Sequence, residues 1–243
     1  KAFRLTVTVT GSGLDIAVHG SGRLAEKARN AASDFTLRAG FARLSVDGEI
    51  VIEPRKPAVL FGDVPVSPPP GAFLQAVASA EQTMADLVFA HLGKARRIAD
   101  LFSGAGAFAL RLAKGAEIHA VETEAASLAA LDRGFRFGSG LKRVTSERRD
   151  LFVRPVTAKE LNAFDGIVFD PPRAGAEAQS RQIAKSDVPL VAAVSCNPAT
   201  LARDLTILIE SGYTLQRVVP VDQFLWSPHV EAVALLTKKK RRR

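Results

Sequence analysis

From residue 73 onward, the chain alternates between short apolar segments typical of buried strands and stretches with helical periodicity. A strand, a helix and a second strand in succession usually form a right-handed parallel crossover. The alternation therefore predicts a doubly wound parallel α/β sheet. The link between the last two strands is too short for a crossover helix, so the last strand should run antiparallel. The expected strands span residues 97–102, 117–122, 144–149, 164–170, 190–195, 214–221 and 229–237.

The N-terminal residues 1–66 predict a small β-rich α+β domain. Residues 3–9 and 14–18 alternate as a hairpin does, and residues 44–52 form a second hairpin around Asp47-Gly48, a signal for a type I′ turn. The stretch 23–38 between them has helical periodicity. This part of the chain is expected to face RNA if it has a binding role.

Three consecutive prolines, Pro68 to Pro70, prevent continuation of a helix or a strand ladder. They indicate a linker over residues 67–72. The larger α/β domain then spans residues 73–237, beginning with a helix at about 76–91, and a basic tail covers 238–243.

The positive charge is concentrated in this tail. The net charge is +8, and the last six residues carry +6 of it, which leaves +2 for the rest. The tail is either a tether for RNA phosphates or a solvated terminus. No apolar run approaches 18 residues and no leading segment resembles a secretory signal. We therefore expect a cytoplasmic protein with no membrane partner. We also expect a monomer.

Cys196 is the only cysteine, which excludes a disulfide framework or a cysteine-rich metal site within the chain. It follows the strand expected at 190–195. Asn197 is a good N-cap, and Pro198 is favoured at the first position of a helix. The thiol should thus lie at the carboxyl end of a strand, against a helix N-terminus whose dipole favours the thiolate. The alternative is a small buried hydrophobic side chain.

A glycine-rich turn with Gly104 and Gly106 lies between the first strand of the α/β domain and the helix that follows. Glycines here let the backbone pass close to a ligand. Glu122 ends the next strand, where an acid can accept hydrogen bonds from the ribose hydroxyls of S-adenosylmethionine or of a dinucleotide. A plain tight turn and an exposed strand-end carboxylate are the alternatives.

Two more acids end the third and fourth strands of this domain. Asp150 and Asp170 should point into the same crevice, because the carboxyl ends of parallel strands meet at one edge of the sheet. Pro171 and Pro172 fix the backbone after Asp170, which holds an acid near a ligand at low entropic cost. A purely structural turn is the alternative.

Four segments carry a family resemblance. In order they are residues 100–108, Asp170-Pro-Pro-Arg-Ala-Gly175, Ser195-Cys-Asn-Pro-Ala-Thr200 and Val221-Asp-Gln-Phe-Leu-Trp-Ser-Pro-His-Val-Glu231. Together they resemble the uracil-5 RNA methyltransferase family over roughly residues 73–238. The resemblance implies a Rossmann-like methyltransferase sheet, S-adenosylmethionine as cofactor, no metal, and structured ribosomal or transfer RNA as partner.

The resemblance also implies roles for individual residues. Cys196 would add to uracil C6, and Glu231 would remove the C5 proton. The topology agrees, because an antiparallel last strand inserted beside the fifth brings Glu231 to the edge that holds Cys196. A closed pocket there would raise the pKa of Glu231 toward that of a general base. The pocket for cofactor and uracil would be lined by Gln75, Phe102, Gly104, Gly106, Glu122, Asp150 and Asp170.

Several side chains near these motifs have two interpretations. Phe224 and Trp226 either stack on an extruded base or pack in the core or loop. His229 is expected to cap its loop. Arg173 contacts a phosphate or forms a structural ion pair.

The sequence leaves other functions open. An Asp-Pro-Pro turn also occurs in amino-methyltransferases, although those usually place an aromatic residue where this chain has Arg173. A cytosine-5 enzyme is a second alternative. An RNA-binding module with a vestigial pocket is a third, because Val77 and Ala107 replace asparagines of the family pattern. Ala193 likewise replaces a tyrosine, and Leu225 a proline.

Overall fold

The computed structural model describes residues 2–239 and contains two compact units. The smaller unit holds residues up to Leu60 together with Pro65–Phe73, and the larger holds Phe61–Val64 and the chain from Leu74 onward. The three prolines thus pack with the smaller unit. The functional division of the chain into domains and a linker stays a prediction.

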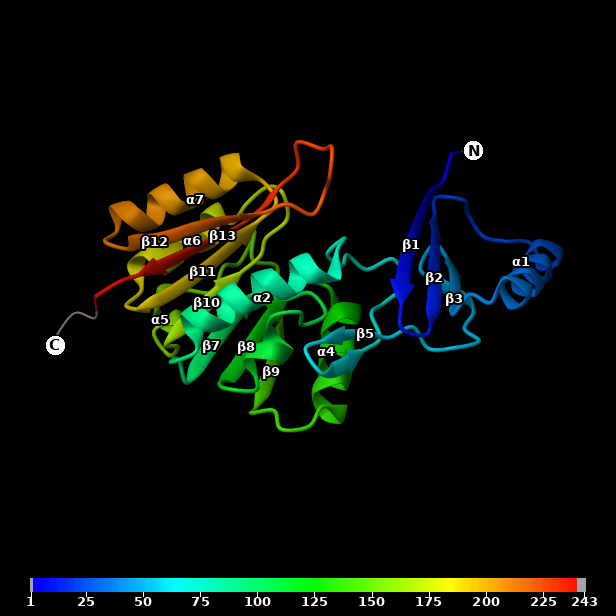
Figure 1. Cartoon of the computed structure of the whole chain (residues 1–243), viewed down its shortest axis with the longest axis horizontal. Helices are drawn as coiled ribbons and strands as arrows, with labels where there is room; N and C mark the ends of the chain where they lie inside the picture. Colours follow the sequence, from blue (N-terminus) through cyan, green and yellow to red (C-terminus); the bar gives the residue numbers. More distant parts are fainter. Residues whose placement is uncertain (1, 240–243) are drawn as a thin grey trace. The chain divides into compact units, whose positions relative to one another are not determined.

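The smaller unit is built on a four-stranded sheet with the order β1-β2-β3-β4 (Figure 1). The central strands β2 and β3 are parallel and are connected by the helix α1, and the outer pairs are antiparallel. Asp47 and Gly48 both have positive φ, 48° and 85°, as the predicted type I′ turn requires. The elements are β1 (Arg4–Thr10), β2 (Gly13–His19), α1 (Glu26–Ala39), β3 (Arg43–Val46) and β4 (Glu49–Ile52).

A buried ion pair holds the proline segment to this unit. Arg43 donates from Nε and Nη2 to the two carboxylate oxygens of Asp15, at 2.8 and 2.5 Å, and both side chains are 3% exposed. Nη2 also donates to the carbonyl oxygen of Pro68 at 2.9 Å.

A further hairpin, β5 (Val59–Phe61) with β6 (Val64–Val66), was not predicted from the sequence.

The larger unit contains a seven-stranded sheet with the order β12-β13-β11-β10-β7-β8-β9. Only β13 runs opposite to the other strands of this sheet, and it inserts between β12 and β11. The predicted α/β fold and the antiparallel last strand are confirmed. The elements are α2 (Ala78–Leu92), β7 (Arg97–Leu101), α3 (Ala109–Leu112), β8 (Glu117–Glu122), α4 (Ala125–Phe137), β9 (Val144–Arg148), α5 (Ala158–Leu161), β10 (Gly166–Phe169), α6 (Glu177–Lys185), β11 (Leu190–Ser195), α7 (Pro198–Glu210), β12 (Thr214–Val221) and β13 (Glu231–Thr237).

Helices cover both faces of this sheet (Figure 1). One core cluster joins α2, α3 and α4 to strand residues such as Ile98, and the other joins α5, α6 and α7 to residues such as Ala99 and Leu101. Neighbouring residues of a strand therefore enter opposite cores, which explains why the strands are apolar throughout. Chain order reverses between β7 and β10, so the ligand crevice of an open α/β sheet is expected at their carboxyl ends.

The predicted basic tail lies largely outside the described residues, which end at 239. Within them, Lys238 donates from Nζ to the carbonyl oxygens of Ala184 and Ser186, at 2.9 and 3.0 Å, and lies 4.7 Å from the ring centre of Tyr213. Lys238 therefore takes part in the packing of the larger unit. Among the described helices, none is long and apolar enough to cross a membrane.

Candidate active site

Cys196 and Glu231 meet at the carboxyl edge of the sheet. Ser195, the last residue of β11, pairs with Ala232 of the antiparallel β13. Cys196 is the residue that follows β11, and Glu231, the first residue of β13, precedes Ala232. The two residues therefore stand side by side although they are far apart in the chain. The predicted approach of the last strand to the fifth is confirmed at the level of the backbone.

Glu231 is a buried acid with one oxygen held and the other without a partner. The residue is 2% exposed. Its Oε1 accepts a hydrogen bond from Gln223 Nε2 at 3.1 Å, and its Oε2 has no hydrogen-bond partner among the described residues. Burial raises the pKa of Glu231, and the hydrogen bond from Gln223 opposes the rise. A raised pKa makes the Glu231 carboxylate a stronger proton acceptor than an ordinary surface carboxylate.

Gln223 connects Glu231 to the segment before α2. Its Nε2 also donates to Gln75 Oε1 at 2.7 Å, and its Oε1 accepts from the backbone N–H of Val77 at 3.3 Å. The predicted pocket residue Gln75 thus lies near Glu231, because both side chains accept hydrogen bonds from the same Gln223 amide. Sequence reasoning gave Gln223 no role, although it lies in the last motif and directly after β12 at this edge.

The Cys196 thiol is half-buried between acids. Burial raises its pKa first, and the negative charges of Glu231 and Asp170 raise it further. A backbone hydrogen bond and the Arg173 guanidinium lower the pKa of Cys196, but the net shift remains upward. The net shift in the pKa of Cys196 is thus upward, opposite to the shift that a helix N-terminus alone favours, because desolvation and two nearby carboxylates disfavour the thiolate.

Asp170 follows β10 and lies within the electrostatic reach of Glu231 and Cys196. Desolvation and then the charge of Glu231 raise the pKa of Asp170 to about 7, although part of its surface stays accessible. The segment that follows Asp170 is tied to the start of α7. The carbonyl oxygen of Arg173 accepts from Asn197 Nδ2 at 3.0 Å and from Thr200 Oγ1 at 3.3 Å.

Glu122 is held against the glycine-rich turn. Its Oε2 accepts from the backbone N–H of Gly104 at 3.0 Å, and its Oε1 accepts from the N–H groups of Thr123 and Glu124 at 2.6 and 3.0 Å. Gly104 has φ 53°, and a Cβ built on it would meet open space. A Cβ on Gly106 would instead lie 3.0 Å from the Leu131 side chain. Gly104 therefore leaves room for a ligand, whereas Gly106 allows close packing.

Unpartnered buried polar atoms border the same crevice. Asp100 is 1% exposed, and neither of its carboxyl oxygens has a hydrogen bond of normal geometry; the Ser103 hydroxyl is likewise buried without a partner. Burial raises the pKa of Asp100 well above its usual range; the backbone N–H of Ala109 opposes the rise, and the charges of Asp170 and Glu122 add to it. Buried polar groups are normally paired, so these atoms suit a polar ligand.

Phe102 and Asp150 lie on neighbouring loops of the crevice. Phe102 directly follows β7 and has a left-handed φ of 61°. Its ring centre lies 5.5 Å from that of Phe152. Asp150 is exposed, and its Oδ1 accepts from the backbone N–H of Phe152 at 2.9 Å. The ring contact therefore brings the loop after β9 to the end of β7, as a shared pocket requires.

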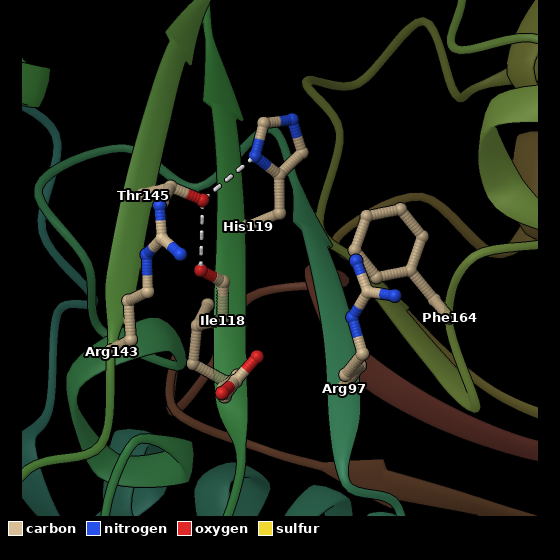
Figure 2. Close-up of a pocket in the computed structure, with 7 residues that line it drawn as sticks. Arg97, Ile118, His119, Arg143, Thr145 and Phe164 are labelled. Carbon is tan, nitrogen blue, oxygen red and sulfur yellow. Dashed lines mark hydrogen bonds between the residues drawn. The ribbon is translucent and has the colours of Figure 1, made fainter.

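A separate hollow of about 160 Å³ lies at the other end of the strands (Figure 2). Arg97 and Glu117 begin β7 and β8, whereas the candidate site lies where these strands end. His119 shares a hydrogen bond with Thr145 Oγ1 at 3.0 Å, and Arg97 lies over the Phe164 ring at 5.5 Å. The hollow contains none of the predicted site residues. Across residues 2–239, no group of three or more metal-ligating side chains is arranged to hold a metal ion.

Comparison with known proteins gives a family match in the C-terminal part. Residues 142–239 match the model of the tRNA (uracil-5-)-methyltransferase family. An uncharacterised RNA methyltransferase of Mesorhizobium japonicum is 69% identical over the whole chain, which covers 59% of that protein. The 23S rRNA (uracil(1939)-C(5))-methyltransferase RlmD of Chromohalobacter salexigens is 38% identical over 70% of this chain and 35% of its own length.

A solved structure has the same fold. The tRNA (uracil-54, C5)-methyltransferase of Pyrococcus abyssi, in complex with S-adenosyl-L-homocysteine, superposes with a TM-score of 0.75 and 24% identity, over 96% of this chain and 59% of that one. The chain spans less than two thirds of the length of curated relatives that it matches. The family match and these relatives confirm the resemblance inferred from the motifs, and the chain is related to the uracil-5 RNA methyltransferase family.

Proposed function

We propose that this chain contains the catalytic part of an S-adenosylmethionine-dependent RNA methyltransferase, which forms 5-methyluridine in ribosomal or transfer RNA. The observation that carries the proposal is the pairing of Ser195 with Ala232, which sets the Cys196 thiol beside the Glu231 carboxyl. A nucleophile and a base at one edge are the two groups that C5 methylation of uracil needs. The names of the relatives support the substrate class.

The crevice fits a nucleoside cofactor. Glu122 is held by three backbone N–H groups next to the glycine turn, and Gly104 leaves open space there. In this side-chain position the Glu122 oxygens can accept hydrogen bonds from the ribose hydroxyls. The unpartnered atoms of Asp100 and Ser103 offer further polar contacts. When bound, S-adenosylmethionine supplies an electrophilic methyl group.

Cys196 activates the uracil. The C5 carbon of uracil is a poor nucleophile, so direct methylation is slow. Attack of the Cys196 thiolate on C6 forms an S–C6 bond and moves the C5–C6 π electrons to C5 and the O4 carbonyl. The resulting enolate carries the electron pair at C5 that would form the new C–C bond, and bound S-adenosylmethionine would supply the methyl group, its sulfur keeping the electrons of the broken S–C bond.

Glu231 then restores the double bond. The methylated C5 carries one proton, which the Glu231 carboxylate removes. The electrons of that C–H bond re-form the C5–C6 double bond, and the Cys196–C6 bond breaks to release the thiolate. Gln223 holds one oxygen of Glu231, so the unpartnered Oε2 is the one positioned to accept the proton.

The thiol must lose its proton before it attacks. Its pKa is raised in the structure, chiefly by burial and then by Glu231 and Asp170. The pKa of Asp170 lies at about 7, so this carboxyl gains and loses a proton in the neutral range. Protonation of Asp170 removes a negative charge that raises the pKa of the Cys196 thiol, so it favours the thiolate.

Analysis of the methylated nucleoside tests this function. Transfer RNA and 23S rRNA transcripts are incubated with labelled S-adenosylmethionine and the protein, and the nucleosides are separated. We expect labelled 5-methyluridine, and none with Cys196→Ala. Label in 5-methylcytidine or in an exocyclic N-methyl nucleoside would replace the proposal with the corresponding alternative. Binding of S-adenosylmethionine and RNA without any transfer would indicate a vestigial pocket.

A further inference from the structure

The loop between β12 and β13 ends directly at Glu231 and extends beyond the ends of both strands (Figure 1). The start of this loop is anchored in the site, because the Gln223 side chain donates hydrogen bonds to Glu231 and Gln75. A tight turn follows, in which the N–H of Ser227 donates to the carbonyl oxygen of Phe224 at 3.0 Å. Leu225 and Trp226 occupy the two central positions of this turn.

The two central side chains of the turn project into solvent. Trp226 is 103% exposed and Leu225 is 78% exposed, so neither contributes to the core. Phe224 instead lies half-buried, with its ring 6.2 Å from that of His229. Of the two interpretations of these aromatics, packing thus applies to Phe224 and not to Trp226. A fully exposed tryptophan offers a large apolar surface without a partner in the unit that holds it.

The backbone of Trp226 is strained. Its φ is 65°, in the left-handed region, and the third position of a tight turn with positive φ normally holds glycine or asparagine. Three non-glycine residues in the described chain have positive φ. Asp47 forms a hairpin turn, and the other two, Phe102 and Trp226, both lie at the carboxyl edge of the larger sheet. Packing of the Trp226 side chain within the chain does not offset this strain, which points to a contact outside the chain.

We propose that Trp226 and Leu225 form an apolar wedge that enters the base stack of RNA next to the target uridine. This inference rests on the proposed function. An enzyme that reacts with a base inside structured RNA must take that base out of its stack, which costs unstacking energy. An apolar side chain inserted between bases compensates for the lost contact, and an indole stacks on any base. The loop is placed for this role, because the wedge is only a few residues from Glu231, the group that acts on the extruded ring.

Fluorescence tests the contact directly, because Trp226 is the only tryptophan of the chain. The probe is a hairpin RNA with a single uridine stacked in its loop, and its binding is followed separately by the anisotropy of an end label. At saturating RNA we expect Trp226 emission to be quenched and its accessibility to acrylamide to fall several-fold. Unchanged accessibility at saturation would overturn the wedge.

Variants separate a contact with RNA from a structural role. Trp226→Gly relieves the strain and removes no packing, so its Tm should equal or exceed that of the wild type. On the hairpin its kcat/KM for methylation should fall about tenfold or more, since stacking on one base contributes about 1–3 kcal/mol. On single-stranded oligouridine, whose bases need little extrusion, the loss should be below about threefold. Trp226→Phe should retain most of the activity on the hairpin.

Phe137→Ala is the matched control, because Phe137 is 81% exposed on α4 of the same unit, away from this loop. It should leave methylation of both RNAs unchanged. Equal losses of Trp226→Gly on hairpin and oligouridine, or no loss on either, would overturn the wedge. Failure of the proposed function looks different, because the wild type would then methylate neither RNA, while acrylamide protection still reports whether Trp226 contacts the hairpin.

Discussion

Gln223 donates a single amide N–H₂ group to both Glu231, at 3.1 Å, and Gln75, at 2.7 Å. The amide therefore fixes one oxygen of the buried acid and leaves the other without a partner. The hydrogen bond from Gln223 opposes the rise that burial causes in the pKa of Glu231. Gln223 is thus a positioning residue for the proposed base.

Loss of this amide should move the pH dependence of turnover. In Gln223→Ala the pKa of Glu231 rises further, so a smaller fraction of the acid is ionised at neutral pH. A hydrogen bond to a charged group contributes about 1.5–3 kcal/mol, and we expect 5-methyluridine formation at pH 7 to slow by about tenfold or more, with partial recovery at higher pH. The pH–rate profile measures this. Gln216→Ala, an exposed glutamine on β12, is the control, and a profile identical to that of the wild type in Gln223→Ala would contradict the role.

The Cys196 thiol should ionise above the usual range for cysteine. Because the chain has one cysteine, the rate of iodoacetamide labelling against pH reports on this group alone. Asp170→Asn removes a negative charge that raises the pKa of Cys196, so its labelling curve should shift to lower pH. Arg173→Gln removes a charge that lowers this pKa, so its curve should shift to higher pH. Shifts of the opposite sign would refute the electrostatic description of the site.

The two glycines of the turn should respond differently to alanine. Gly106→Ala brings a Cβ within 3.0 Å of Leu131 in a backbone with φ 98°, so the larger unit should lose stability. Gly104→Ala meets open space with φ 53°, so its cost should be only about 1 kcal/mol, while the added methyl group faces the ligand. Thermal melts and titration with S-adenosylmethionine check this: Gly104→Ala should fold but bind at least several-fold more weakly. Full affinity in Gly104→Ala would show that the cofactor does not approach this turn.

The sheet could be predicted from the sequence because its strands are short apolar runs that alternate with helical stretches. The antiparallel direction of β13 followed from the short link after β12. The hairpin of β5 and β6 was missed, since each strand has three residues and the second contains Pro65. Three-residue strands carry too little alternation to be recognised.

The candidate site could be predicted in part. Motifs and strand ends indicated Cys196, Glu231 and Gln75, which the structure brings to one edge. The bridging role of Gln223 depends on a contact across 148 positions, which no local pattern reveals. The helix N-terminus beside Cys196 is visible in the sequence, whereas the desolvation and the two acids that raise the pKa of the thiol appear only in three dimensions.

The most direct test of the account is covalent trapping with RNA that contains 5-fluorouridine. Fluorine at C5 cannot leave as a proton does, so the Cys196–C6 bond should persist after methyl transfer. We predict a denaturation-stable protein–RNA adduct that requires S-adenosylmethionine, maps to Cys196 by mass spectrometry, and is absent in Cys196→Ala. An adduct that still forms in Cys196→Ala, or 5-methyluridine formed by that variant at the wild-type rate, would contradict the account.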